Sequence, residues 1–175
     1  GNSVIGDDLT STADGFSFAT NVTLTTTDAI TIQTGAGAAD DLVITGTLTG
    51  VDDNLTIDAG AAGDITLTGA VNLGTGTLTI TDADVVEISS TLTAAAFTQT
   101  DGTTSTTIDG AVTTTGAFDF TGQALTLNGA VNSIGTSMDV TNAGLFTTAD
   151  AADLTVGTEF VQDGLGNSVI GADLT

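Results

Sequence analysis

The side chains best suited to chemistry in this sequence are its acids, several of which come in pairs beside glycines. Carboxylates and backbone carbonyls at a turn are the oxygen ligands that Ca²⁺ prefers. Eight acids are candidate calcium ligands on this ground: Asp7, Asp8, Asp40, Asp41, Asp52, Asp53, Asp82 and Asp84. An aspartate at a turn also bonds nearby backbone N–H groups without any metal. We favour this turn role and keep calcium as the alternative.

Catalysis would have to rest on carboxylates alone, because the chain has no Lys, Arg, His, Cys or Tyr. Two acids are sufficient to hydrolyse glycosides. Carbohydrate sites usually add aromatic platforms and basic residues, whereas here the only aromatic residues are seven Phe. We therefore expect no enzyme activity, no catalytic residue, no small-molecule substrate and no cofactor other than calcium.

The 22 acids have no basic partner, which gives a formal net charge of −22 at pH 7. Unpaired carboxylates are costly to bury, so we expect them on solvated surface and turns. Nothing in the chain can neutralise phosphate, which excludes nucleic acid and anionic membrane surfaces as partners. No run approaches the roughly 20 apolar residues of a membrane span, and no run has the pattern of a signal peptide. Any export signal is expected to lie outside this segment.

The chain is nevertheless not typical of disorder, because 40% of its residues are hydrophobic and its mean hydropathy is +0.35. Val, Ile, Leu, Phe and Thr recur in short runs in which apolar and polar residues alternate. Such runs predict short strands with one buried face, separated by glycine turns. No window shows the apolar spacing of a helix.

The two ends of the chain repeat each other. Gly1–Thr10 reads GNSVIGDDLT and Gly166–Thr175 reads GNSVIGADLT, with Asp7 against Ala172 as the only difference. The match predicts one long repeat, residues 1–165, followed by the first ten residues of the next, cut from a tandem array. We expect residues 1–175 to form one continuous domain in which residues 166–175 take the place that residues 1–10 hold one period earlier.

A shorter repeat lies inside the long one, with the pattern apolar-x-apolar-x-small-x-apolar, as in FSFATNVT and LVITGTLT. Its seven copies begin at Phe16, Leu42, Ile65, Val86, Thr106, Leu125 and Leu154. A second alternating run follows most copies, and the longer intervals leave room for a third short strand such as LFTT at Leu145.

Seven copies in one long repeat give about 24 residues each, which suits one coil of a parallel β-solenoid. We predict an all-β fold of about seven coils per long repeat, stacked about 4.8 Å apart. The first residues of the seven copies would form one inward column. Another column would contain Val22, Leu48, Val71, Leu92, Val112, Val131 and Phe160. The alternative is an antiparallel β-sandwich, which strands at this spacing also suit.

The segments DITLTGAVN, LTLNGAVN and TTIDGAVT resemble the repeats of large secreted bacterial surface proteins, such as filamentous-haemagglutinin-like adhesins. The resemblance implies a right-handed parallel β-helix, exported to the cell surface or the medium of a bacterium or archaeon. We therefore expect a structural protein that forms a stiff extracellular filament or stalk, with itself as partner. Two alternatives remain: an adhesin built on a β-helix, and separate subunits stacked head-to-tail.

Overall fold

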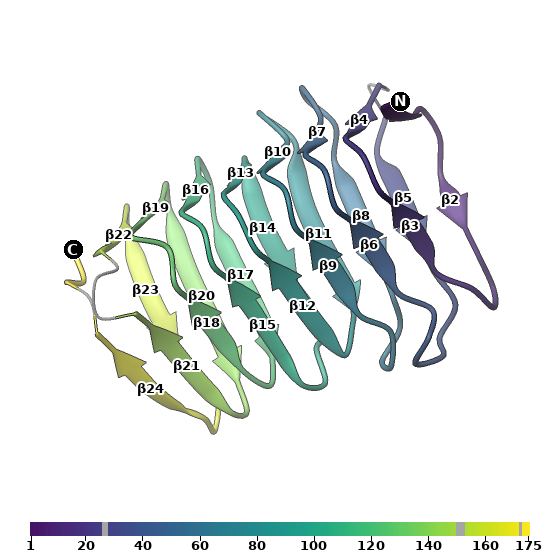
Figure 1. Ribbon diagram of the computed structural model, residues 1–175. Helices are drawn as coiled ribbons and strands as arrows, with labels where there is room; N and C mark the ends of the chain where they lie inside the picture. The colour runs from purple at the N-terminus through teal and green to yellow at the C-terminus, as the bar shows by residue number, and fades with distance from the viewer. Residues whose placement is uncertain (26–27, 150–152, 172) are drawn as a thin grey trace.

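The computed structural model describes residues 1–25, 28–149, 153–171 and 173–175. In this part of the chain there are 24 short strands and no helix, and the strands form three parallel sheets of eight (Figure 1). Successive strands visit the three sheets in a constant order, so every three strands complete one coil. The predicted parallel β-solenoid is therefore confirmed, with about eight coils in the chain. The antiparallel sandwich is wrong, because every strand pairing among the described residues is parallel.

We name the sheets A, B and C in the order in which the chain reaches them. Sheet A consists of β1 (Ser3–Ile5), β4 (Val22–Leu24), β7 (Leu48–Thr49), β10 (Val71–Asn72), β13 (Leu92–Ala94), β16 (Val112–Thr114), β19 (Val131–Ile134) and β22 (Asp153–Val156). Sheet B consists of β2 (Leu9–Thr10), β5 (Ile30–Gln33), β8 (Leu55–Asp58), β11 (Thr77–Asp82), β14 (Ala96–Gln99), β17 (Phe118–Gly122), β20 (Ser137–Asn142) and β23 (Glu159–Gln162). Sheet C consists of β3 (Phe16–Phe18), β6 (Leu42–Ile44), β9 (Ile65–Leu67), β12 (Val85–Ile88), β15 (Ser105–Ile108), β18 (Leu125–Leu127), β21 (Leu145–Thr148) and β24 (Asn167–Ile170).

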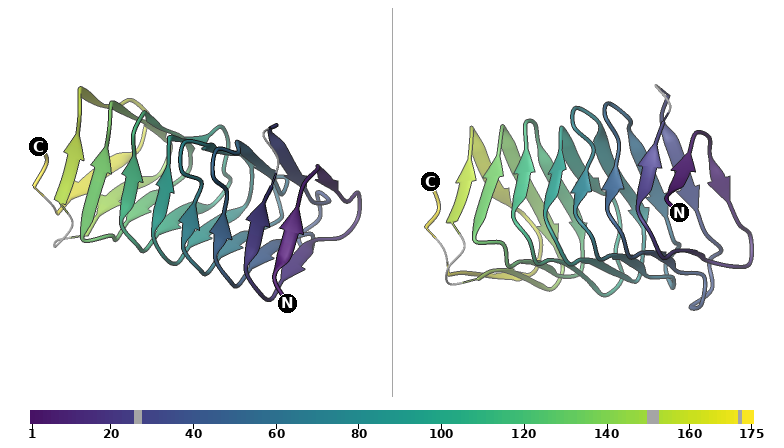
Figure 2. Two further views of the ribbon diagram at one scale, coloured as in Figure 1. Left: turned by 90° about the horizontal axis from the view of Figure 1, so that it is seen from above. Right: turned by 45° about the horizontal axis from the view of Figure 1, so that its top comes forward.

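The coils stack along one axis, with the two termini at opposite ends of an elongated body (Figure 2). Alternate side chains of each strand point inward, so equivalent residues of neighbouring coils form apolar columns. In sheet C, for example, Leu42 pairs with Ile65, and Ile65 pairs with Val86. All three side chains are buried, as are nearly all the inward apolar residues between the two end coils. One continuous core therefore runs the length of the molecule.

The corner from sheet C to sheet A explains the small residue in the short repeat. From β3 to β19, three residues separate each strand of sheet C from the next strand of sheet A. The middle position of these corners is often glycine. A Cβ atom on Gly69 would lie 2.4 Å from the carbonyl oxygen of Gly46, one coil away, and Gly129 approaches Gly110 equally closely. Successive corners are so close that a side chain would force the coils apart.

The predicted position of the seventh copy of the short repeat is wrong. Leu154 lies in β22 of sheet A, and the residue that continues the first inward column after Leu125 is Phe146 of β21. The run LFTT, predicted as an optional third strand, is therefore the true strand of sheet C. Alternation alone cannot assign a strand to one of three sheets, because all three have the same buried-exposed period.

The second predicted column is also wrong at two positions. Val131 is 55% exposed, whereas its neighbour Asn132 is fully buried. The Asn132 side chain accepts a hydrogen bond from the Val112 N–H at 3.1 Å and donates one to the Gly129 carbonyl at 3.0 Å, which allows its burial. The register is therefore shifted by one residue from the predicted one at the start of β19, so that Asn132 points inward and Val131 points outward. Phe160 belongs to sheet B, where it pairs with Met138.

The matching ends of the chain do not occupy equivalent places. Ser3–Ile5 pairs with β4 in sheet A, whereas Asn167–Ile170 pairs with β21 in sheet C. The prediction that residues 166–175 take the place of residues 1–10 one period later is therefore wrong as to the sheet, although both segments form strands of the solenoid.

The aromatic stack in sheet B is the clearest test of the core. The rings of Phe97 and Phe118 are fully buried, with centroids 4.6 Å apart and planes inclined by 20°. We expect Phe118→Ala to destabilise the fold by about 3–5 kcal/mol, because it leaves a cavity between two coils. The outward substitution Thr98→Ala on the neighbouring strand should cost less than about 1 kcal/mol. Denaturant midpoints followed by circular dichroism measure both, and equal losses would contradict the assigned inward face.

Candidate functional site at the acidic corners

The eight candidate calcium ligands are distributed over two corners and do not meet at one site. The corner between sheets A and B, here called the AB corner, carries Asp7 and Asp8 in the first coil and Asp52 and Asp53 in the third. The BC corner lies between sheets B and C. It carries Asp40, Asp41 and Asp84, and Asp82 is the last residue of β11 next to it.

At the BC corner, carboxylates accept hydrogen bonds from backbone N–H or hydroxyl groups of the following coil. Asp41 Oδ1 accepts a hydrogen bond from the N–H of Asp64 at 2.9 Å, and Asp64 Oδ1 accepts one from the N–H of Val85 at 3.2 Å. Asp84 Oδ1 then accepts bonds from the hydroxyls of Thr103 and Thr104. Each acid therefore fastens the start of a sheet C strand in the next coil.

Side chains at the AB corner likewise accept hydrogen bonds from the following coil. Asp8 Oδ1 accepts a hydrogen bond from the N–H of Thr31 at 2.7 Å, and Asn54 Oδ1 accepts one from the N–H of Thr77 at 3.0 Å. Asp52 accepts a bond from the Thr75 hydroxyl. Asp64 and Asn54 were not predicted, because neither belongs to a pair of adjacent acids. The signal that identifies them is a single Asp or Asn directly before a strand.

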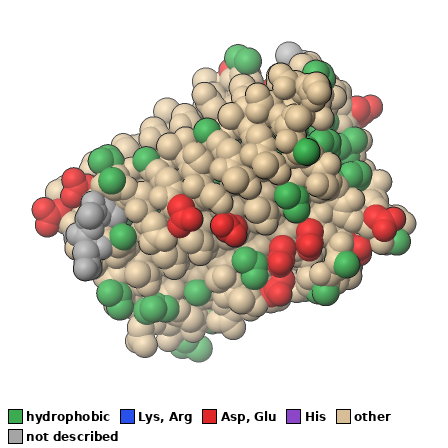
Figure 3. Space-filling model, viewed as in Figure 1, with side chains coloured by type: hydrophobic (Ala, Val, Ile, Leu, Met, Phe, Trp, Pro, Cys, Tyr) green, Lys and Arg blue, Asp and Glu red, His purple; other side chains and the backbone are tan. Residues whose placement is uncertain are grey.

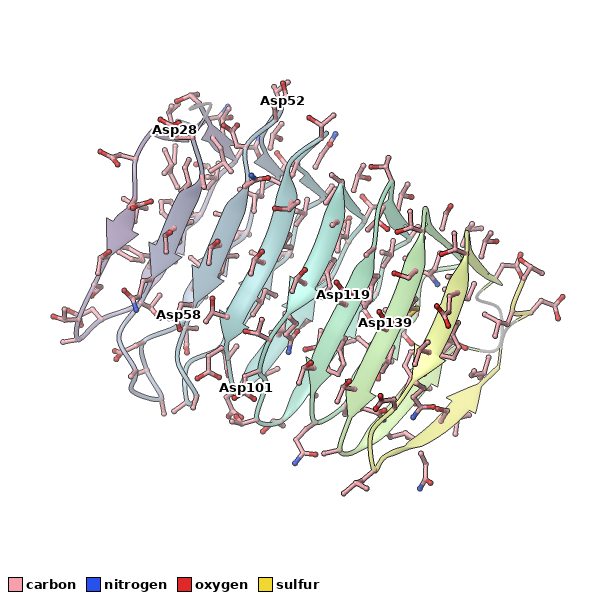
Figure 4. The ribbon with its side chains drawn as sticks, turned by 180° about the vertical axis from the view of Figure 1, so that it is seen from behind. Asp28, Asp52, Asp58, Asp101, Asp119 and Asp139 are labelled. Carbon is pink, nitrogen blue, oxygen red and sulfur yellow. The ribbon has the colours of Figure 1, made fainter. Side chains whose placement is uncertain are left out.

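Two of the acids at the BC corner have pKa values shifted in opposite directions. The hydroxyl of Thr104, followed by that of Thr103, lowers the pKa of Asp84. Burial raises the pKa of Asp82, and the negative charges of Asp101 and Asp58 raise it further. Figure 4 shows Asp58 and Asp101 at the same corner of the solenoid. Asp82 Oδ1 is buried and has no hydrogen-bond partner among the described residues.

Among the acids that the structure describes, Asp53 is the least exposed. It is 3% exposed, and its Oδ1 atom has no hydrogen-bond partner in the part of the chain that the structure describes. Asp40 is 9% exposed, but its Oδ2 accepts the N–H of Gly37 at 2.8 Å. Among the described residues, no three His, Cys, Asp or Glu side chains are placed to hold a metal ion together. A calcium ion at Asp53 would need backbone oxygens and water as its other ligands, and it stays a prediction.

One acidic pair was not predicted from the sequence. Asp119 of β17 and Asp139 of β20 are partners in the register of sheet B, and Figure 4 shows them on neighbouring strands. Burial raises the pKa of Asp119, and the charge of Asp139 raises it further. Alignment of the runs AFDFT and SMDVT, which place Asp at the same position, would have revealed the stack. Figure 3 shows the opposite face, where several acids gather across the middle of the molecule and others lie near its two ends.

Searches against known protein families, curated proteins and solved structures found no match to this chain. In the described residues no helix is long and apolar enough to cross a membrane.

The Asp119–Asp139 pair predicts a pH-dependent stability. Because the folded state raises the pKa of Asp119, its protonated form is favoured on folding, and that stability is lost as the pH rises through the raised pKa. We expect Asp119→Asn to raise the unfolding midpoint at pH 7 by roughly 2–4 °C, for a cross-strand repulsion of up to about 1 kcal/mol. The gain should vanish below the ordinary pKa of 3.8.

Glu87→Gln is the matched control, since Glu87 also points outward but pairs with Thr66 and Thr107. Thermal unfolding from pH 3 to pH 7 compares the two variants with the parent chain. An equal gain in both at pH 7 would mean that only net charge matters, and not the stacked pair.

Calcium is tested by comparing salts. We expect NaCl and CaCl₂ at matched ionic strength to raise the unfolding midpoint equally, because both screen the repulsion among the 22 acids. EDTA should then have no effect beyond its own ionic strength. A gain specific to Ca²⁺ that is lost in Asp53→Asn and kept in the exposed control Asp163→Asn would overturn this expectation and place an ion at Asp53.

Proposed function

We propose that this chain is a structural segment of a stiff extracellular or cell-surface filament or stalk, and that it has no enzyme activity. The observation that carries the proposal is the pair of open ends. One core and three parallel sheets run from β1, β2 and β3 at one end to β22, β23 and β24 at the other (Figure 1). Open strand edges are templates for further pairing, and solenoid repeats are stabilised by their neighbours.

The side chains at the two ends support stacking of further coils. At the C-terminal end the inward residues Ile170 and Leu174 are 38% and 44% exposed. At the other end Phe16 and Phe18 pack against the core but are only partly buried. A following repeat would cover these apolar groups and pair the open strand edges at the same time. The partner that fits both ends is therefore a further copy of the repeat.

The surface between the ends favours a single fibre over a bundle. It carries acids and no base, so two such solenoids side by side repel each other at low salt. The lack of Lys and Arg also removes the cleavage sites of trypsin-like proteases, which suits exposure outside the cell. Together with the resemblance to secreted surface proteins, this composition supports an extracellular location.

An adhesin is the second candidate, and one observation favours it. An open hollow of about 400 Å³ lies at the BC corner, lined by residues of three successive coils that include Asp101, Gln123 and Asn142. No aromatic ring or basic group is among the described residues that line it, so it lacks the usual means of holding a sugar or an acidic ligand. We therefore place the filament first.

The filament predicts how molecular length depends on repeat number. Chains with one, two and four long repeats should be unbranched rods of constant width in electron micrographs. Each repeat should add roughly 35–40 Å, since coils are about 4.8 Å apart. Globules joined by flexible links would contradict the proposal. The mass of the natural chain on a denaturing gel separates a covalent array from stacked 17.1 kDa subunits.

A further inference from the structure

We infer that successive long repeats are turned by one face of the three-sided coil, so that a given segment lies on a different sheet in each repeat. This inference rests on the proposed tandem filament and states how its repeats join. Two observations carry it: the positions of the matching ends, and the spacing of strands that follows from β24 on sheet C.

The matching ends already lie on different sheets. The first copy places Ser3–Ile5 on sheet A and Leu9 on sheet B, where Leu9 pairs with Ile32. In the second copy Asn167–Ile170 lies on sheet C and Leu174 on sheet A, where it bridges to Leu154. The same segment has therefore moved back by one sheet over one long repeat.

The segment can occupy either sheet because its pattern is the same in both. Its Ser and Ile point inward and its Val points outward in each copy. Ile5 is buried against Leu24 of sheet A, and Ile170 pairs with the buried Thr148 of sheet C. In both copies three residues separate Ile from the next Leu, the same length as the corners from sheet C to sheet A. Neither the strand nor its corner specifies one sheet.

Chain length across the junction gives the second observation. Among the paired strands of sheet C, the shortest step between equivalent positions leads from Thr106 to Leu125, and the longest leads from Phe16 to Leu42. Ser168 of β24 is the equivalent of Ser3 in the second copy. The residue equivalent to Phe16 in the next repeat would therefore lie as many residues after Ser168 as Phe16 lies after Ser3. That interval is clearly shorter than the step from Thr106 to Leu125, so it is too short for a full coil in this solenoid. The next Phe16 must therefore lie on sheet B, one sheet after Leu174.

Sheet B offers a suitable place for the next Phe16. Phe160 of β23 pairs with Met138 at the open end of the inward column that contains Phe97 and Phe118. Phe160 is only partly buried there. A Phe16 from the following repeat would stack on this ring and extend the aromatic column.

Strand counting gives the size of the turn. Among the described strands β24 is the twenty-third after β1, and three strands make one coil, so one long repeat spans seven and two-thirds coils. Three long repeats, roughly 110 Å at about 4.8 Å per coil, then restore the original sheet. An outward feature such as the Asp119–Asp139 pair would pass around the fibre from repeat to repeat and would not form one acidic stripe.

Disulfide formation tests the junction directly, because the natural sequence has no cysteine. Neighbouring parallel strands bring paired Cα atoms within the range that a disulfide spans. We would prepare a chain of residues 1–165 followed by residues 1–175, and substitute Ser17→Cys in its second repeat. One variant adds Val161→Cys in the first repeat, on sheet B. The matched variant instead adds Thr147→Cys, on sheet C. Mild oxidation followed by a non-reducing gel detects the closed loop.

We expect the disulfide to form in the Val161→Cys variant and not to form in the Thr147→Cys variant. Closure through Thr147→Cys would overturn the turn by one face and would leave the filament proposal intact. If neither variant closes while both keep the β circular dichroism of the parent, the repeats do not continue one solenoid, and both proposals fail. In the single chain, Thr147→Cys with Val169→Cys should close, because these residues pair in sheet C, and Thr155→Cys with Val169→Cys should not.

Discussion

Parallel stacking of coils is the constraint on which the rest of this structure depends. Each strand between the two end coils pairs with the coil before it and the coil after it, at a distance fixed by the backbone hydrogen bonds. A strand residue is therefore stacked on the equivalent residue of the next coil, with a local shift of register such as that between Ile80 and Asp82. Apolar columns gain from this, as Phe97 and Phe118 do. Acids do not gain, since burial raises the pKa values of Asp119 and Asp82 and the charges of neighbouring acids raise them further.

The acidic composition makes the corners the natural place for most of the carboxylates. No basic side chain is present to pair with an acid, so backbone N–H groups, hydroxyl groups and the amides of Asn and Gln are the donors that remain. A corner acid reaches the N–H groups that begin the next coil, as Asp41 reaches Asp64 and Asp8 reaches Thr31. The same side chain is thereby solvated on one side and bonded on the other. The acids that give the chain its net charge therefore also link neighbouring coils through hydrogen bonds.

The sequence was sufficient to predict the repeat architecture and much of its register. The first column was correct from Phe16 to Leu125, because the corner from sheet C to sheet A keeps a constant length and a recognisable small residue. It failed at Leu154 because the other corners vary in length and the three sheets share one alternation. The second column failed at Val131 because the burial of Asn132 depends on hydrogen bonds to Val112 and Gly129 in three dimensions. The partners of the corner acids were equally hidden, since they lie about one coil away along the chain.

Nearest-neighbour stacking also explains why the long repeat need not contain a whole number of coils. A coil interacts with the coil before and the coil after it, so its stability depends on local fit and not on position within a repeat. The AB and BC corners absorb differences in coil length, while each strand requires only an alternating pattern above and below it. A repeat unit that ends on any of the three sheets can therefore be continued by its own first strand. In such a fibre the sequence period and the structural period are set independently, and a unit whose strand number is not a multiple of three changes face at every junction.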